Sequence, residues 1–205
     1  VGGFDVTKGP INQDFMYLTP QTSNNGQYNT FLGYGSGHSM TTGKENVILG
    51  VSAGYKNTTG GQNVFVGKCA GYYNKTGYYN VIIGWSDLSK YPWTTPTDLG
   101  DANTLIGYST SIGVTGDENT ILGNLAGQSL TTGSYNCIFG STAGQSLVSG
   151  NGNVMLGEEA GINATGQENV FVGGAAGSSN TSGDFIVIST NHEGCFVPRF
   201  AWFSQ

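Results

Sequence analysis

The chain has 205 residues, of which 35 are glycine and 10% are charged, and its net charge is −6. Glycine destabilises a helix interior by about 1 kcal/mol per residue, so this composition disfavours a helical protein. The seven lysines and arginines form no basic stripe, which argues against a nucleic-acid partner, and no apolar run is long enough to insert into a membrane as a helix.

Residues 1–28 precede the repeats and carry several large apolar side chains, among them Phe15, Met16, Tyr17 and Leu18. The end of a repeat stack exposes unpaired strand edges that need a cover. We therefore expect residues 1–28 to form an N-terminal cap.

A repeated phrase occupies residues 29–183, in which an asparagine is followed by a short apolar run and a glycine. Successive copies are spaced by 16 or 17 residues, apart from one spacing of 23. Regular spacing of this size predicts a solenoid of about nine coils, and the strand-forming triplets described next make it an all-β protein, a β-solenoid. The nine copies begin at Asn29, Asn46, Asn63, Asn80, Asn103, Asn119, Asn136, Asn153 and Asn169.

The apolar run of each copy is a triplet rich in β-branched and aromatic residues, which favours a strand and is too short for a helix. An Ala-Gly pair follows most triplets, and its small residues would allow a second strand in the same coil. The glycine after each triplet and the later Thr-Gly pair suit turns.

Side chains alternate in direction along a strand, so the middle residues of the triplets form one column. In a monomer this column would be a continuous exposed apolar patch, and we expect other copies of the same chain around a symmetry axis to cover it. A covering segment of the same chain is the alternative. The predicted core of this assembly, a trimer core if the resemblance described below holds, is Phe31, Ile48, Phe65, Ile82, Leu105, Ile121, Ile138, Met155 and Phe171.

The asparagines that open the repeats should stack into a ladder of side-chain amides with a structural role. Cys69 and Cys137 would then lie four rungs apart, about 19 Å, which is too far for an intrachain disulfide. His38 and His192 have no partners at a metal-binding spacing, and we expect neither a metal nor another cofactor.

The spacing of 23 places an insertion at residues 85–101, and insertions in a solenoid leave the stack as loops. Its aromatic side chains could stack on sugar rings or anchor a protein, and its carboxylates could accept hydrogen bonds from hydroxyl groups. The alternative is that the aromatic residues pack against neighbouring coils. The candidate ligand-binding residues are Trp85, Asp87, Tyr91, Trp93, Asp98 and Asp101.

Asp98 and Asp101 could also be imagined as the carboxylate pair of a glycosidase, but nothing in the sequence indicates a cleft between them. We expect no enzymatic activity. Threonines beside the turn glycines, such as Thr58 and Thr131, suggest ice binding, yet they lack the alternating T-x-T pattern of a flat strand.

Residues 184–205 follow the repeats. The segment 185–188 continues as one more apolar strand, and the aromatic tail that includes Phe200 and Trp202 suits capping of the stack or docking onto the next part of a fibre.

The repeat phrase, seen most clearly in residues 46–54 (NVILGVSAG) with Thr59-Gly60 after them, resembles the head repeats of trimeric autotransporter adhesins and related bacteriophage tail-fibre proteins. The resemblance implies an extracellular homotrimer of parallel β-rolls on a bacterial surface or a virion, which adheres to a cell-surface glycan or protein receptor. A purely structural viral spike or capsid-associated fibre segment is the alternative function.

Overall fold

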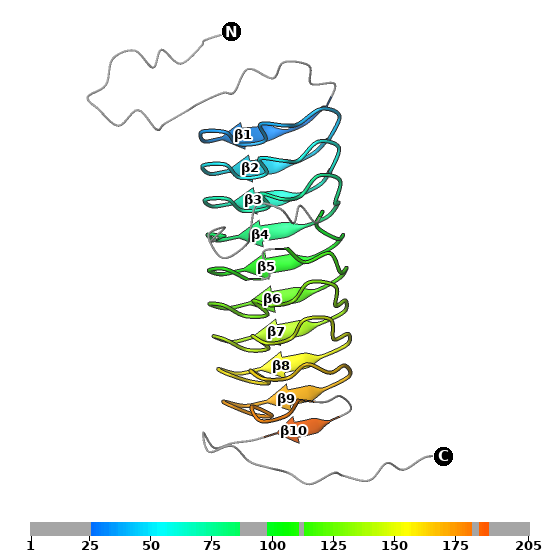
Figure 1. The fold of residues 1–205 in the computed structure, drawn as a ribbon. Helices are drawn as coiled ribbons and strands as arrows, with labels where there is room; N and C mark the ends of the chain where they lie inside the picture. Colours follow the sequence, from blue (N-terminus) through cyan, green and yellow to red (C-terminus); the bar gives the residue numbers. More distant parts are fainter. Residues whose placement is uncertain (1–25, 87–97, 111–112, 182–184, 189–205) are drawn as a thin grey trace, which may run out of the picture.

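The structure is a computed structural model that describes residues 26–86, 98–110, 113–181 and 185–188. Each coil contributes one three-residue strand to a single parallel sheet, and the strands follow one another in chain order (Figure 1). The predicted parallel β-solenoid with coils of about 17 residues is confirmed. The strands are β1 (Thr30–Leu32), β2 (Val47–Leu49), β3 (Val64–Val66), β4 (Val81–Ile83), β5 (Thr104–Ile106), β6 (Thr120–Leu122), β7 (Cys137–Phe139), β8 (Val154–Leu156), β9 (Val170–Val172) and β10 (Ile186–Ile188).

Strand pairing stacks equivalent repeat positions directly over one another. Ile48 pairs with Phe65, and Phe65 pairs with Ile82, so each triplet meets the next without a shift. β10 continues this register by pairing with β9, which confirms the apolar strand predicted after the last repeat.

The Ala-Gly pairs lie in turns, so the second strand suggested for this segment is wrong. Ser52 and Gly54 both have positive φ, at 55° and 53°, which is incompatible with an extended strand. The turns still bond from coil to coil, because the Gly54 N–H donates to the Ala70 carbonyl at 2.8 Å.

The middle residues of the triplets point into the coil of their own chain. Side chains such as Ile48 and Phe171 are fully buried in the single chain, and Phe31 in the first strand is half-buried. The opposite wall of the interior consists of small and medium apolar residues, including Ala53, Ala143 and Leu147.

The prediction that the middle column is exposed until a trimer covers it is therefore wrong. The column is the core of the solenoid itself, and the second half of each coil supplies the cover. This correction applies to Phe31, Ile48, Phe65, Ile82, Leu105, Ile121, Ile138, Met155 and Phe171. The homotrimer stays a prediction that needs a different surface.

The asparagine ladder is present, and it lies inside the coil. In a typical rung, the Asn63 side-chain amide donates to Asn46 Oδ1 at 3.0 Å and to the Gly77 carbonyl at 2.9 Å. The backbone N–H of Asn63 donates to the same Asn46 oxygen at 3.0 Å. Each rung thus satisfies polar groups of fully buried residues and links two consecutive coils.

The glycine that closes each strand allows the coils to approach closely. At Gly33, where φ is +126°, an added Cβ would lie 2.6 Å from the Gly50 carbonyl oxygen of the next coil. A side chain is excluded there both by the backbone conformation and by the neighbouring coil.

Candidate functional site

The insertion lies between β4 and β5 and does not interrupt the stack. The Asn103 N–H donates to Asn80 Oδ1 at 2.9 Å across 23 residues, and the two strands pair in register. The asparagine ladder is therefore continuous across the insertion, as it is between the shorter coils. Asp87, Tyr91 and Trp93 lie outside the described residues.

Trp85, at the start of the insertion, has a side chain that is 47% exposed. The Lys68 ammonium lies 5.0 Å from the centre of its ring, and the Tyr108 ring meets it edge-on with centroids 5.4 Å apart. Lys68, Trp85 and Tyr108 occupy the same position in three successive coils. Trp85 therefore packs between the side chains of its neighbours while keeping part of its surface open.

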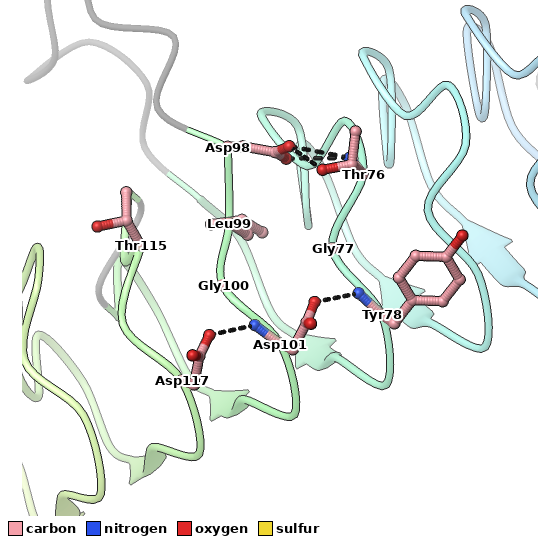
Figure 2. A pocket seen from close by; sticks show the side chains of 9 residues that line it. All are labelled: Thr76, Gly77, Tyr78, Asp98, Leu99, Gly100, Asp101, Thr115 and Asp117. Carbon is pink, nitrogen blue, oxygen red and sulfur yellow. Dashed lines mark hydrogen bonds between the residues drawn. The ribbon is translucent and has the colours of Figure 1, made fainter.

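Asp98 and Asp101, at the end of the insertion, both accept hydrogen bonds from the preceding coil (Figure 2). Asp98 accepts from the Lys75 N–H at 2.6 Å and also from the Thr76 N–H and hydroxyl. Asp101 accepts from the Tyr78 N–H at 2.7 Å. Both carboxylates thus fix backbone groups of the neighbouring coil, as well as lying at the surface.

These two carboxylates line an open hollow of about 670 Å³ together with Thr76, Tyr78 and Thr115. Asp117, which sequence reasoning missed, also lines it and accepts from the Asp101 N–H at 2.8 Å. The hollow is shallow and lined by both polar and apolar atoms, and its three carboxylates could accept hydrogen bonds from hydroxyl groups.

Asp101 and Asp117 belong to a polar row that continues beyond the hollow. The Asp117 N–H donates to Ser134 Oγ at 3.0 Å, and the Ser134 N–H donates to Asn151 Oδ1 at 2.8 Å. All four residues stand two positions before a ladder asparagine. That constant offset was the signal in the sequence that could have identified them as one row.

An aromatic stack on the first coils was also missed. His38, Tyr55 and Tyr72 lie face to face, with ring centroids 4.6 and 5.3 Å apart, at the same position of consecutive coils. The Lys56 ammonium lies over the rings of Tyr72 and Tyr73. Because neighbouring rings cover one another's faces, this stack stabilises the coils and leaves little open ring surface for a sugar.

Cys69 and Cys137 are free thiols, as their predicted separation required. Cys69 is buried, and burial raises the pKa of its thiol, although nearby Lys68 acts in the opposite direction. His192 lies outside the described residues. In the part of the chain that the structure describes, no group of three histidine, cysteine or acidic side chains could hold a metal ion, and no helix is long and apolar enough to cross a membrane.

The sheet has an outer face, which we define as the first and third residues of the ten strands. None of these twenty residues is charged, and all are exposed or half-exposed in the single chain. Apart from three threonines they are apolar, counting Cys137. The first column is Thr30, Val47, Val64, Val81, Thr104, Thr120, Cys137, Val154, Val170 and Ile186, and the third is Leu32, Leu49, Val66, Ile83, Ile106, Leu122, Phe139, Leu156, Val172 and Ile188.

Comparison of the chain with protein-family models, with curated proteins and with solved structures finds no match.

Proposed function

We propose that the chain is a non-enzymatic, receptor-binding head segment of an extracellular homotrimeric fibre, of the bacterial surface or phage type. Its receptor would be a cell-surface glycan or protein, bound at the insertion between β4 and β5. The observation that carries this proposal is a regular stack of coils into which one long insertion fits without loss of register.

The stack has the properties of a rigid display scaffold. Its buried asparagine ladder and in-register strands hold each coil to the next, so residues added to one coil need not disturb the others. The described ends of the insertion carry half-exposed Trp85 and the hollow lined by the Asp98 and Asp101 carboxylates, groups that suit a sugar ring and its hydroxyls.

Binding of the intact assembly to a glycan array and to host-cell surface proteins tests the proposal. Replacing Tyr91 and Trp93 together by Ala should abolish binding and leave the melting temperature unchanged. Val148→Ala is the control, because Val148 is 48% exposed in the turn between β7 and β8, away from the insertion, and this variant should bind normally. A double variant that binds as well as the unaltered protein contradicts a receptor site in the insertion.

A purely structural fibre segment is the second candidate function. Its support is that Trp85, Asp98 and Asp101 all contact neighbouring coils, as packing residues would. This function predicts that the Tyr91 and Trp93 double variant loses thermal stability and that the intact assembly binds no receptor.

A further inference from the structure

The outer face of the sheet is uncovered in the single chain, although parallel sheets in proteins are usually covered on both faces. Ten strands about 4.8 Å apart give it a length of about 43 Å. A soluble chain seldom leaves so long an uncharged apolar strip exposed to water. A partner for this face must be uncharged at the contact and must match strands that repeat at a fixed spacing.

Two columns flank the outer face, and all their residues are exposed except Ser141 and Gly174, which are half-buried. The left flank is the residue before each ladder asparagine, and the right flank is the residue after the glycine that closes each strand. From left to right the two flanks and the outer face span about 20 Å, which gives a surface on the order of 900 Å², against about 800 Å² per partner in a standard stable interface. The left flank is Tyr28, Glu45, Gln62, Tyr79, Ala102, Glu118, Tyr135, Gly152 and Glu168, and the right flank is Tyr34, Val51, Lys68, Trp85, Tyr108, Asn124, Ser141, Glu158 and Gly174.

The two flanks complement each other coil by coil. Tyr28 and Tyr34 share the first coil, and Tyr79 and Trp85 share another, so aromatic residues coincide twice. No coil carries a charge on both flanks: Glu158, for example, has Gly152 opposite it. If the left flank of one copy met the right flank of the next at the same height, aromatic side chains would meet and like charges would not.

We infer that the outer face is where further copies of this chain pack, parallel and coil to matching coil around a common axis, with left flank against right flank. This inference rests on the homotrimer of the proposed function and supplies the surface for it in place of the middle column. A second copy is the partner that fits this surface, because it offers the same strand spacing, the same uncharged columns and a complementary flank.

The first test measures the mass of the full chain in solution at micromolar concentration. The unaltered protein should have about three times the 21.4 kDa mass of the chain. Thr120→Asp and Val154→Asp, on the first column, should each reduce the mass to that of one chain while the circular dichroism spectrum stays native. Ser149→Asp, at an exposed position in the turn between β7 and β8, should keep the assembly.

Cys137 provides a second measurement on the same variants. Its thiol is half-exposed on the first column in the single chain, so assembly should slow its alkylation by maleimide at least tenfold. With Cys195→Ser as background, the Val154→Asp variant should restore fast alkylation. The inference would be overturned if the aspartate variants kept the mass of the unaltered assembly and Cys137 was alkylated fast in every protein. It would also be overturned if the unaltered chain were monomeric.

The parallel arrangement is tested by a pyrene label on Tyr28→Cys, with both Cys137→Ser and Cys195→Ser so that the half-exposed thiol of Cys137 is not labelled. Parallel copies bring the labels together and should give excimer fluorescence, whereas antiparallel copies hold them about 40 Å apart. Absence of excimer in an intact assembly overturns the parallel arrangement. If the assembly contained two copies and Val154→Asp dissociated it, the outer face would be supported as the interface and the homotrimer contradicted. If only receptor binding were absent, only the proposed function would be contradicted.

Discussion

The residue before each ladder asparagine has a left-handed backbone, although only one of these nine residues is glycine. Gly152 has φ of 65°, and Glu118 at the equivalent position has φ of 55°. A side chain at such a φ is disfavoured by about 1 kcal/mol. The column therefore stores a small strain in almost every coil, which the ladder and the strand pairs outweigh.

We expect Gly152→Ala to lower the free energy of unfolding by about 1 kcal/mol, and Glu118→Gly to raise it by a smaller amount. An added Cβ at Gly152 would meet only Glu168 Cγ at 3.7 Å, an ordinary contact, so this substitution isolates the backbone term. Denaturant unfolding of both variants measures the two values. An unchanged midpoint for Gly152→Ala would show that the left-handed position costs nothing here.

Asn57 lies in a column that several other coils fill with apolar side chains, although Asn74 and Asn180 share its position. It is fully buried, and neither its amide nitrogen nor its amide oxygen has a hydrogen-bond partner among the described residues. Leu130 and Leu147 occupy the equivalent positions, with the same backbone bond to the glycine three residues earlier. Asn57 therefore costs stability that a leucine would not.

Asn57→Leu should raise the free energy of unfolding by about 1–3 kcal/mol, since burial of an unsatisfied amide carries a penalty of that size. The measurement is thermal or denaturant unfolding of the assembled protein. Leu130→Asn is the reciprocal variant and should destabilise by at least as much. Destabilisation by Asn57→Leu would mean that the amide makes an essential contact.

At the scale of the strand, adjacent residues face opposite environments, and β6 offers a direct comparison. Ile121 is fully buried in the solenoid core, whereas Thr120 and Leu122 on either side are exposed. A charge at Ile121 would have no partner in the core.

We expect Ile121→Asp to unfold the chain, at a cost of about 4 kcal/mol or more, and not merely to dissociate an assembly. Thr120→Asp, one residue away, should keep the fold. Far-ultraviolet circular dichroism and urea unfolding separate the two outcomes. A natively folded Ile121→Asp chain would contradict the assignment of the middle column to the interior.

The triplets also show why sequence reasoning found the strands and misplaced their faces. Glycine boundaries and β-branched residues such as Val47 identify each strand, and alternation places Asn46 and Ile48 on the same side. Alternation alone leaves open which side is the interior. A polar asparagine beside each middle residue looks like a surface pattern, but Asn29 and the Gly60 carbonyl satisfy the Asn46 amide inside the coil.

The site was less predictable than the fold, for a similar reason. Sequence spacing revealed the insertion, and the ladder across Asn80 and Asn103 confirms that the stack continues past it. Apart from the Thr76 hydroxyl, the donors to Asp98 and Asp101 are backbone N–H groups more than twenty residues earlier. A main-chain donor has no residue-specific signal, so only the structure reveals these bonds.

At the scale of the whole molecule, the described strands contact only their immediate neighbours along the chain. Coils are therefore interchangeable units. Deleting residues 119–135 removes one repeat of 17 and leaves Glu118 followed by Asn136, another ladder asparagine. We expect a folded, shorter rod with moderately lower stability, which small-angle scattering and thermal unfolding can measure.

Deleting residues 119–127, about half a coil, is the control for that experiment. It would place turn residues where a strand should be and break the ladder, so the variant should lose native circular dichroism. Equal stability of the two deletion variants would contradict the independence of the coils.

The hydrogen bonds between strands run along the axis of the stack, and this direction determines how the rod responds to a mechanical load. A pull on the two chain ends loads the bonds of an end coil first, so the rod peels coil by coil. Each freed coil of about 17 residues extends to roughly 56–61 Å, while the stack becomes about 4.8 Å shorter. The end-to-end length of the chain therefore increases by about 50 Å per coil. A tethered rod of this kind would act as an extensible shock absorber, lengthening in equal steps as it gives way.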